Sequence, residues 1–252
     1  MSGLISKCGL DNWWKKELTK EERQTIESVF TPYTSSGEMR GILTSGDGSA
    51  FAREGTFQFL SMLLGWFKKP EYYQIICKIV KVADSLIHTE KRIINKHFYY
   101  LSKIKAYYPC RNAIPGSLDL AIKACEDQIA ISKEVAKEIL KGEKRYTLKS
   151  EEKMAADILE GLDDKDSPPD KYEGVTLPDG FNPVIHNDPN DYEIIPGRLY
   201  EHTGYKQLCI IREKQGNWGE VIRLASEALE QGWPGEWDKR IEKAKKKLEQ
   251  GK

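Results

Sequence analysis

Apolar side chains recur at helical spacing along most of the chain, and this periodicity limits the fold more than any other feature. In residues 71–88, for example, Ile75, Ile79 and Ala83 fall on one face of a 3.6-residue repeat. The other segments with helical patterning are residues 19–30, 50–67, 90–108, 118–131, 133–141, 151–162, 199–215, 217–230 and 237–250. The sequence therefore predicts an all-α fold of antiparallel helix pairs.

Residues at the ends of these segments predict where several helices start and stop. Thr19 and Glu22 have the spacing of a capping box, in which each side chain satisfies a free backbone N–H group. Ser117 is expected to cap the helix that follows it. Gly216 and Gly232 stand where a helix C-terminus often adopts a left-handed conformation.

Residues 163–198 interrupt the helical pattern. Six of the 11 prolines fall in this stretch, and nine acidic residues face three basic ones. A helix of normal length does not fit between these prolines, because proline lacks the N–H group that a helix interior needs. We expect a long acidic, Pro-rich loop, with a short strand near residues 192–195.

Charge and hydropathy exclude some classes of protein. The 252 residues include 39 basic and 39 acidic ones, and this zero net charge argues against a dedicated nucleic-acid binder. Residues 57–67 form the longest apolar stretch, which at 11 residues is too short to span a membrane. The first ten residues lack the pattern of a secretory signal. We expect a cytoplasmic protein with no membrane partner.

The balanced total conceals two oppositely charged halves. Residues 1–149 carry 24 basic and 17 acidic side chains, a formal charge of +7, whereas residues 150–252 carry −7. The halves either simply differ, or attract each other within one chain or between two copies. Self-association therefore stays open.

The five cysteines indicate a reducing compartment. Their number is odd and no two form a C-x-x-C unit, so the sequence shows neither a zinc knuckle nor a redox motif. Cys77, Cys125 and Cys209 lie among aliphatic residues in helical patterns. We expect them to be small buried hydrophobic side chains.

Residues 205–232 resemble a tetratricopeptide repeat (TPR), a pair of antiparallel helices joined by a tight turn. Gly216 fits the turn glycine, and small residues fall where the two helices of the repeat approach each other. Arg212 departs from the pattern, because the family prefers an aromatic residue there. The residues that fit are Tyr205, Leu208, Cys209, Gly216, Trp218, Val221, Ala225 and Ala228.

The resemblance implies right-handed superhelical stacking of helix pairs, closed by a capping helix from Trp237. A looser copy of the pattern runs from Leu101 to Cys125. We therefore expect an N-terminal helical region with one degenerate TPR-like pair (residues 1–145), a short helix with the acidic loop (146–198), and a TPR-like pair with its capping helix (199–252). The start at residues 12–16, Asn-Trp-Trp-Lys-Lys, is also similar to bacterial proteins without a known activity.

The sequence offers little for catalysis, cofactors or metals. It contains no G-x-S-x-G, P-loop or G-x-G-x-x-G motif. The acidic run from Asp164 fails the spacing of a calcium loop, because Pro168 and Pro169 take two key positions. A helical enzyme that uses His97, His186 and Asp188 is a minor alternative. We expect no catalytic site, no cofactor and no metal.

A binding role is favoured instead. Proteins with TPR-like repeats bind extended peptides on the first helices of their repeats, and on that analogy Lys103, Lys105, Tyr107, Lys206 and Arg212 are the candidate binding residues. Their cationic groups could pair with a carboxylate of the peptide. The sequence thus predicts a non-enzymatic adaptor that binds a protein or peptide. A small-ligand or nucleotide-sensing helical domain is the alternative.

Overall fold

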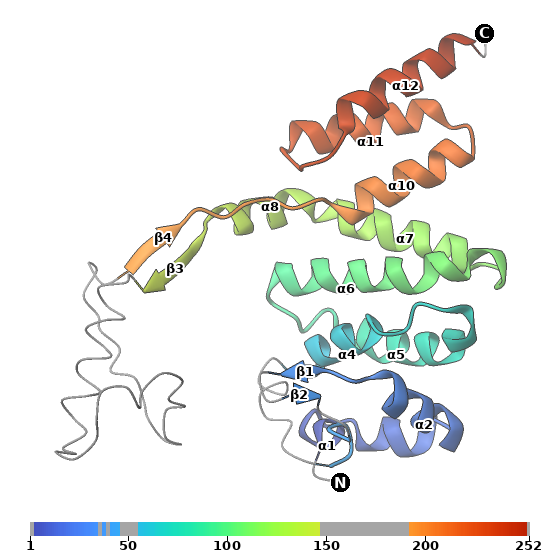
Figure 1. Ribbon diagram of the computed structural model, residues 1–252, viewed down its shortest axis with the longest axis vertical. Helices are drawn as coiled ribbons and strands as arrows, with labels where there is room; N and C mark the ends of the chain where they lie inside the picture. The colour runs from blue at the N-terminus through green and yellow to red at the C-terminus, as the bar shows by residue number, and fades with distance from the viewer. Residues whose placement is uncertain (1–2, 35–36, 39–40, 46–54, 147–191, 251–252) are drawn as a thin grey trace. The chain divides into compact units, whose positions relative to one another are not determined.

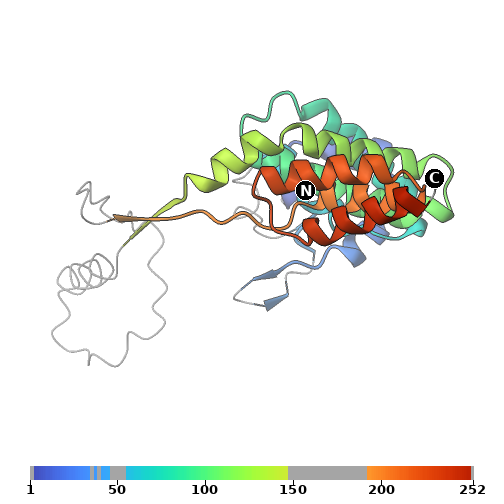
Figure 2. The ribbon, with the colours of Figure 1, turned by 90° about the horizontal axis from the view of Figure 1, so that it is seen from above.

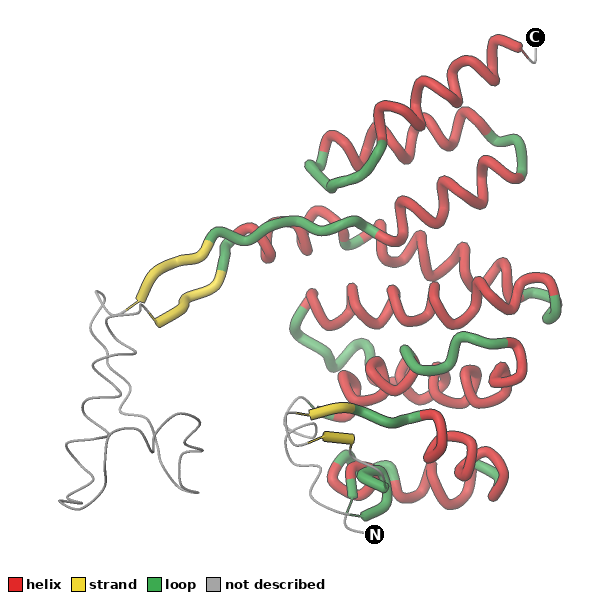
Figure 3. Tube along the Cα trace, viewed as in Figure 1, coloured by secondary structure: helices red, strands yellow, loops and turns green. Residues whose placement is uncertain are grey.

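The computed structural model describes residues 3–34, 37–38, 41–45, 55–146 and 192–250, and this part of the chain is mainly α-helical (Figures 1 and 3). The prediction of an α-helical chain is thereby confirmed at this coarse level. Two compact units are present. One unit combines Met1–Glu138 with Leu199–Lys252, and the other is Ile139–Arg198.

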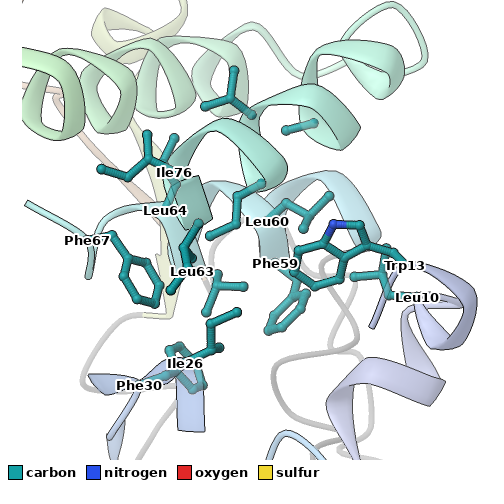
Figure 4. Close-up of a cluster of buried hydrophobic side chains, with 14 of the residues drawn as sticks. Leu10, Trp13, Ile26, Phe30, Phe59, Leu60, Leu63, Leu64, Phe67 and Ile76 are labelled. Atoms are coloured by element: carbon teal, nitrogen blue, oxygen red, sulfur yellow. The ribbon is translucent and has the colours of Figure 1, made fainter. Parts of the chain in front are cut away.

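The first unit begins with short elements that pack on one apolar helix. Helix α4 carries apolar residues on most of its sides, as is typical of a helix buried all round. Phe59, Leu60, Leu63 and Leu64 are almost fully buried, and the close-up shows them among Leu10, Trp13, Ile26 and Phe30 (Figure 4). The elements are α1 (Leu4–Lys7), the π-helix η1 (Trp13–Glu17), α2 (Lys20–Val29), β1 (Tyr33–Thr34), β2 (Gly37–Glu38) and α4 (Thr56–Leu64).

The later helices of this unit form consecutive antiparallel neighbours. Helix α6 packs on α7, α7 on α10, α10 on α11, and α11 on α12. Figure 1 shows these helices in successive layers, and they overlap in Figure 2, which looks down the stack. Their bounds are α5 (Tyr73–Leu86), α6 (Ile93–Tyr107), α7 (Ser117–Ala130), α10 (Thr203–Lys214), α11 (Trp218–Glu230) and α12 (Trp237–Gln250), with 3-10 turns η2 (Pro70–Tyr72) and η3 (Tyr108–Asn112).

The predicted helix ends are correct in three places and wrong in one. The capping box is confirmed: Glu22 N–H donates to Thr19 Oγ1, and Thr19 N–H donates to Glu22 Oε2. Gly216 and Gly232 have φ angles of +70° and +78°, as predicted. Ser117, however, is not a cap. Its hydroxyl donates to the Ile114 carbonyl at 2.8 Å, and the cap position is taken by a left-handed glycine.

The described residues of the second unit include a small antiparallel sheet. Helix α8 (Ser132–Leu140) leads into β3 (Glu143–Tyr146), which pairs with β4 (Tyr192–Ile195). The strand predicted near residues 192–195 is confirmed, whereas its partner has no alternating apolar pattern and was not predicted. A Cβ at Gly197 would lie 1.6 Å from the Ile139 carbonyl oxygen, so the backbones meet at a distance that only glycine allows.

The helix predicted at residues 151–162 and most of the predicted acidic loop lie outside the described residues. Their conformation therefore stays a prediction.

Candidate functional site

Helix α10 is fixed to α6 and α7 by one buried amide. The Gln128 side chain on α7 is fully buried, and its Oε1 accepts a hydrogen bond from Gly204 N–H at 2.6 Å. Its Nε2 donates to the His97 carbonyl oxygen on α6 at 3.0 Å. Buried polar groups stabilise a fold only when they are paired, and this amide pairs groups from three helices at once.

The first turn of α10 fits directly against α7. A Cβ at Gly204 would lie 2.8 Å from Gln128 Oε1 and 3.0 Å from the Cys125 carbonyl oxygen. His202 caps the same turn, because its Nδ1 accepts from Tyr205 N–H at 3.3 Å. The glycine thus allows the close approach, and the histidine satisfies one of the free N–H groups at the helix start.

Two buried histidines adjoin the Gln128 amide. The His97 and His202 rings have centroids 5.0 Å apart, and both also pack against Trp233. Burial lowers the pKa of His97 to about 4. Burial and the neighbouring His97 lower the pKa of His202 to about 3. Both rings are therefore neutral at pH 7.

A closed ring of hydrogen bonds joins α8, α10 and the end of α11. Ser132 Oγ donates to Gln231 Oε1 at 2.7 Å, and Gln231 Nε2 donates to Tyr205 Oη at 2.8 Å. Tyr205 Oη then lies 3.3 Å from Ser132 Oγ, which can accept its proton. Each group has a partner, so this network fixes the relative positions of the three helices.

Replacement of Tyr205 by phenylalanine tests this network. We expect Tyr205→Phe to lower the free energy of unfolding by about 1 kcal/mol, because one buried hydroxyl and its hydrogen bonds are lost. Tyr200→Phe is the control, since no hydrogen bond joins the Tyr200 hydroxyl to the described residues. Urea unfolding of both variants measures the difference, and equal stability of the two contradicts a stabilising role of the ring.

A groove of about 450 Å³ lies next to this network, between α7 and α8 on one side and α11 on the other. Each wall presents residues with the spacing of one helix face, and Leu208 of α10 also lines the groove. The groove is lined by both apolar and charged side chains. The walls consist of Glu126, Ile129, Ala130, Ser132 and Lys133 on one side, and Glu220, Arg223, Leu224 and Glu227 on the other.

The charges of the α11 wall are paired with each other. Arg223 forms two hydrogen bonds with Glu220, at 2.7 and 2.8 Å, and a third with Glu227 at 3.0 Å. The hydrogen bond from Arg223 holds the pKa of Glu220 below its usual value. On the opposite wall, Lys133 is exposed and forms no ion pair with the described residues. Lys133 is therefore available to a ligand.

The structure does not gather the five predicted binding residues into one groove. Lys103 is only 13% exposed and pairs with Asp84 on α5, at 3.0 Å, above the Tyr99 ring. Tyr107 is 3% exposed and belongs to the hydrophobic core, where its ring meets Tyr73. Neither side chain is presented to a ligand in this conformation.

The other three residues are nearer to solvent. Lys105 is exposed on α6, and Lys206 on α10 pairs with Glu201 at 2.8 Å. Arg212 contacts Glu126 at 3.5 Å, which places it beside the wall of the groove although it does not line it. Arg212 is thus the predicted residue nearest to the groove.

The residues that line the groove were not predicted from the sequence. Glu126, Ile129, Ala130 and Lys133 have spacings of three and four residues, which indicates a shared helix face. That signal was present, but nothing in it says that the face opposes α11. The joint that Gln128 forms with His97 and Gly204 gave no signal in the sequence, because these three residues are far apart along the chain.

The described residues contain no group of three or more His, Cys, Asp or Glu side chains that could hold a metal ion. Burial raises the pKa of the Cys125 and Cys209 thiols to about 12, so both stay protonated, as expected of buried cysteines. His186 and Asp188, two of the three residues of the enzyme alternative, lie outside the described residues.

Comparison of the chain with protein-family models, with curated proteins and with solved structures found no match. In the described part of the chain, no helix combines the length and the apolar character that a membrane crossing requires.

Proposed function

We propose that this protein is a non-enzymatic cytoplasmic adaptor that binds a protein or peptide in the groove between α7, α8 and α11. The groove itself carries the proposal: it is open, partly apolar, and bounded by two helix faces about one to two turns long. Such grooves suit the apolar side of a partner helix or a short peptide. The charged rim would then orient the partner.

TPR-like stacking in the C-terminal half is the second element of the proposal. Helices α6, α7, α10, α11 and α12 each pack on the next, as in a repeat array with a final capping helix. The small residues expected at close helix contacts are buried, which supports this interpretation. These are Cys125 on α7, Cys209 on α10, and Val221, Ala225 and Ala228 on α11.

A substitution that fills the groove tests the proposed site. Ala130 lines the groove and is exposed, so Ala130→Arg places a long side chain in the groove without disturbing the core. Ala113→Arg is the matched control, because Ala113 is also exposed but does not line the groove. We expect affinity capture from native lysate, read by mass spectrometry, to retain a protein on the wild type and on Ala113→Arg. Ala130→Arg should lose it.

The same experiment distinguishes the alternatives. If the variant Lys103→Glu plus Lys206→Glu loses the captured protein and Ala130→Arg retains it, the binding site lies at the residues first predicted from the sequence. If no bait captures a protein specifically, the adaptor proposal is contradicted.

The volume of the groove also falls in the rough range of 300–1,000 Å³ that is found for small-ligand sites. A thermal-shift screen with nucleotides and metabolites then tests the ligand-sensing alternative.

A further inference from the structure

His97 and His202 lie edge to face inside the joint between α6, α7 and α10. The angle between their ring planes is 77°, and the two residues are 1% and 0% exposed. Trp233 packs against both rings, with centroid distances of 6.1 Å to His97 and 4.7 Å to His202. Two ionisable side chains are thus held next to each other without contact with water.

The surrounding hydrogen bonds determine which nitrogen of each ring carries the proton. Because Gln128 Oε1 accepts from Gly204 N–H, Gln128 Nε2 must be the donor end of the amide. This group faces His97 Nε2 at 3.4 Å, so that nitrogen accepts and His97 Nδ1 carries the proton. In His202, Nδ1 accepts from Tyr205 N–H, so Nε2 carries the proton. Neither protonated nitrogen has a partner among the described residues.

A second proton can therefore enter each ring only at the nitrogen that now accepts a hydrogen bond. In His202 this nitrogen caps α10, and protonation turns it into a donor that faces another donor, Tyr205 N–H. In His97 it faces the Gln128 amide, with the same result. Each protonation removes an interaction that fixes the joint, and two protonated rings repel each other at this distance.

No neighbouring charge compensates for these protons. Neither ring forms an ion pair with a carboxylate in the described part of the chain, and the nearby Glu201 is exposed and paired with Lys206. Burial raises the pKa of the Tyr200 phenol to about 12 and also raises that of Tyr205, so both phenols stay neutral. The side chains that face the rings are Phe98 from α6, Gln128 from α7, Tyr200 from the segment before α10, Tyr205 from α10 and Trp233 from the segment after α11.

We propose that His97 and His202 form an acid-sensitive joint, whose protonation releases the first turn of α10 from α6 and α7. Because α10 supplies Leu208 to the groove, acid would also dismantle the binding site. This second step rests on the proposed function, whereas the opening of the joint does not.

The direction of the pH dependence follows from burial. In the closed joint the pKa of His97 is about 4 and that of His202 about 3, whereas a solvated histidine has a pKa of about 6.5. The open state therefore binds more protons than the closed state between these values. The joint is fully stable above about pH 6.5 and loses stability as the pH falls toward 4.

Hydrogen–deuterium exchange of the full chain at pH 7.5 and 5.0, corrected for the intrinsic pH dependence of amide exchange, tests the joint. Protonation of each histidine raises the equilibrium constant for opening the joint by up to about 30-fold at pH 5.0. The protection of the amides at the start of α10 should therefore fall by at least tenfold. The amides of α5 should lose much less. The variant His97→Gln plus His202→Asn, in which asparagine can still cap the helix, should show no such loss. His88→Gln, at an exposed histidine, should behave as the wild type.

Unchanged protection of α10 at pH 5.0, or an equal loss in α5 and α10, would overturn the joint. If the double variant fails to fold, the comparison of α10 with α5 in the wild type still decides. The result is independent of the groove: a partner that is captured regardless of Ala130→Arg contradicts the proposed function and leaves the exchange data as they are.

Discussion

Gln128→Leu is expected to lower the free energy of unfolding by about 3 kcal/mol. Leucine fills nearly the same volume, but Gly204 N–H loses its acceptor and His97 loses both of its interactions with the amide. A buried polar group without a partner costs about 1–3 kcal/mol, and more than one group is affected here. In a chain of this size, the loss corresponds to a fall in Tm of about 6–12 °C.

Gln74→Leu on α5 is the matched control, because Gln74 is exposed. We expect it to change stability by less than about 0.5 kcal/mol. Urea unfolding followed by circular dichroism measures both variants. If Gln128→Leu is as stable as Gln74→Leu, the amide does not hold α10 in place.

Two glycine-to-alanine substitutions should have opposite effects on stability. At Gly204 the new Cβ would lie 2.8 Å from Gln128 Oε1 and 3.0 Å from the Cys125 carbonyl oxygen, and both atoms belong to a tightly packed contact. Overpacking of this kind costs about 1–3 kcal/mol. At Gly219 on α11, no atom lies within 4 Å of the new Cβ, and alanine favours the helix by up to about 1 kcal/mol.

We therefore expect Gly204→Ala to destabilise the protein by about 2 kcal/mol and Gly219→Ala to stabilise it slightly. Thermal unfolding of the two variants, compared with the wild type, gives the sign of each change. A stabilising effect at Gly204 would mean that α10 does not approach α7 as closely as described.

Local signals in the sequence were enough to predict most helices, but not the way their faces meet. The capping box at Thr19 and the turn glycine Gly216 act through residues close in sequence, so both were predicted correctly. The groove depends on the relative positions of α7 and α11, and both of these helices pack on α10. Periodicity indicates which face of a helix is apolar but not which helix covers it.

The burial of Tyr107 was not predicted, for the same physical reason. Helix α6 carries aromatic and basic residues on several sides, so its pattern does not separate a binding face from a buried one. Tyr107 proved to be part of the core, and Lys103 is engaged by Asp84 from another helix. Asp84 lies 19 residues from Lys103 in the sequence and on a neighbouring helix, so the local pattern around Lys103 does not indicate this pairing.

Titration calorimetry with the captured partner tests the proposed groove most directly. The wild type and three variants are compared: Ala130→Arg, Ala113→Arg, and Lys103→Glu plus Lys206→Glu. The groove between α7, α8 and α11 predicts that Ala130→Arg alone weakens binding by at least tenfold, which corresponds to about 1.4 kcal/mol. Unchanged affinity of Ala130→Arg, together with a loss in the charge-reversal variant, would contradict this assignment.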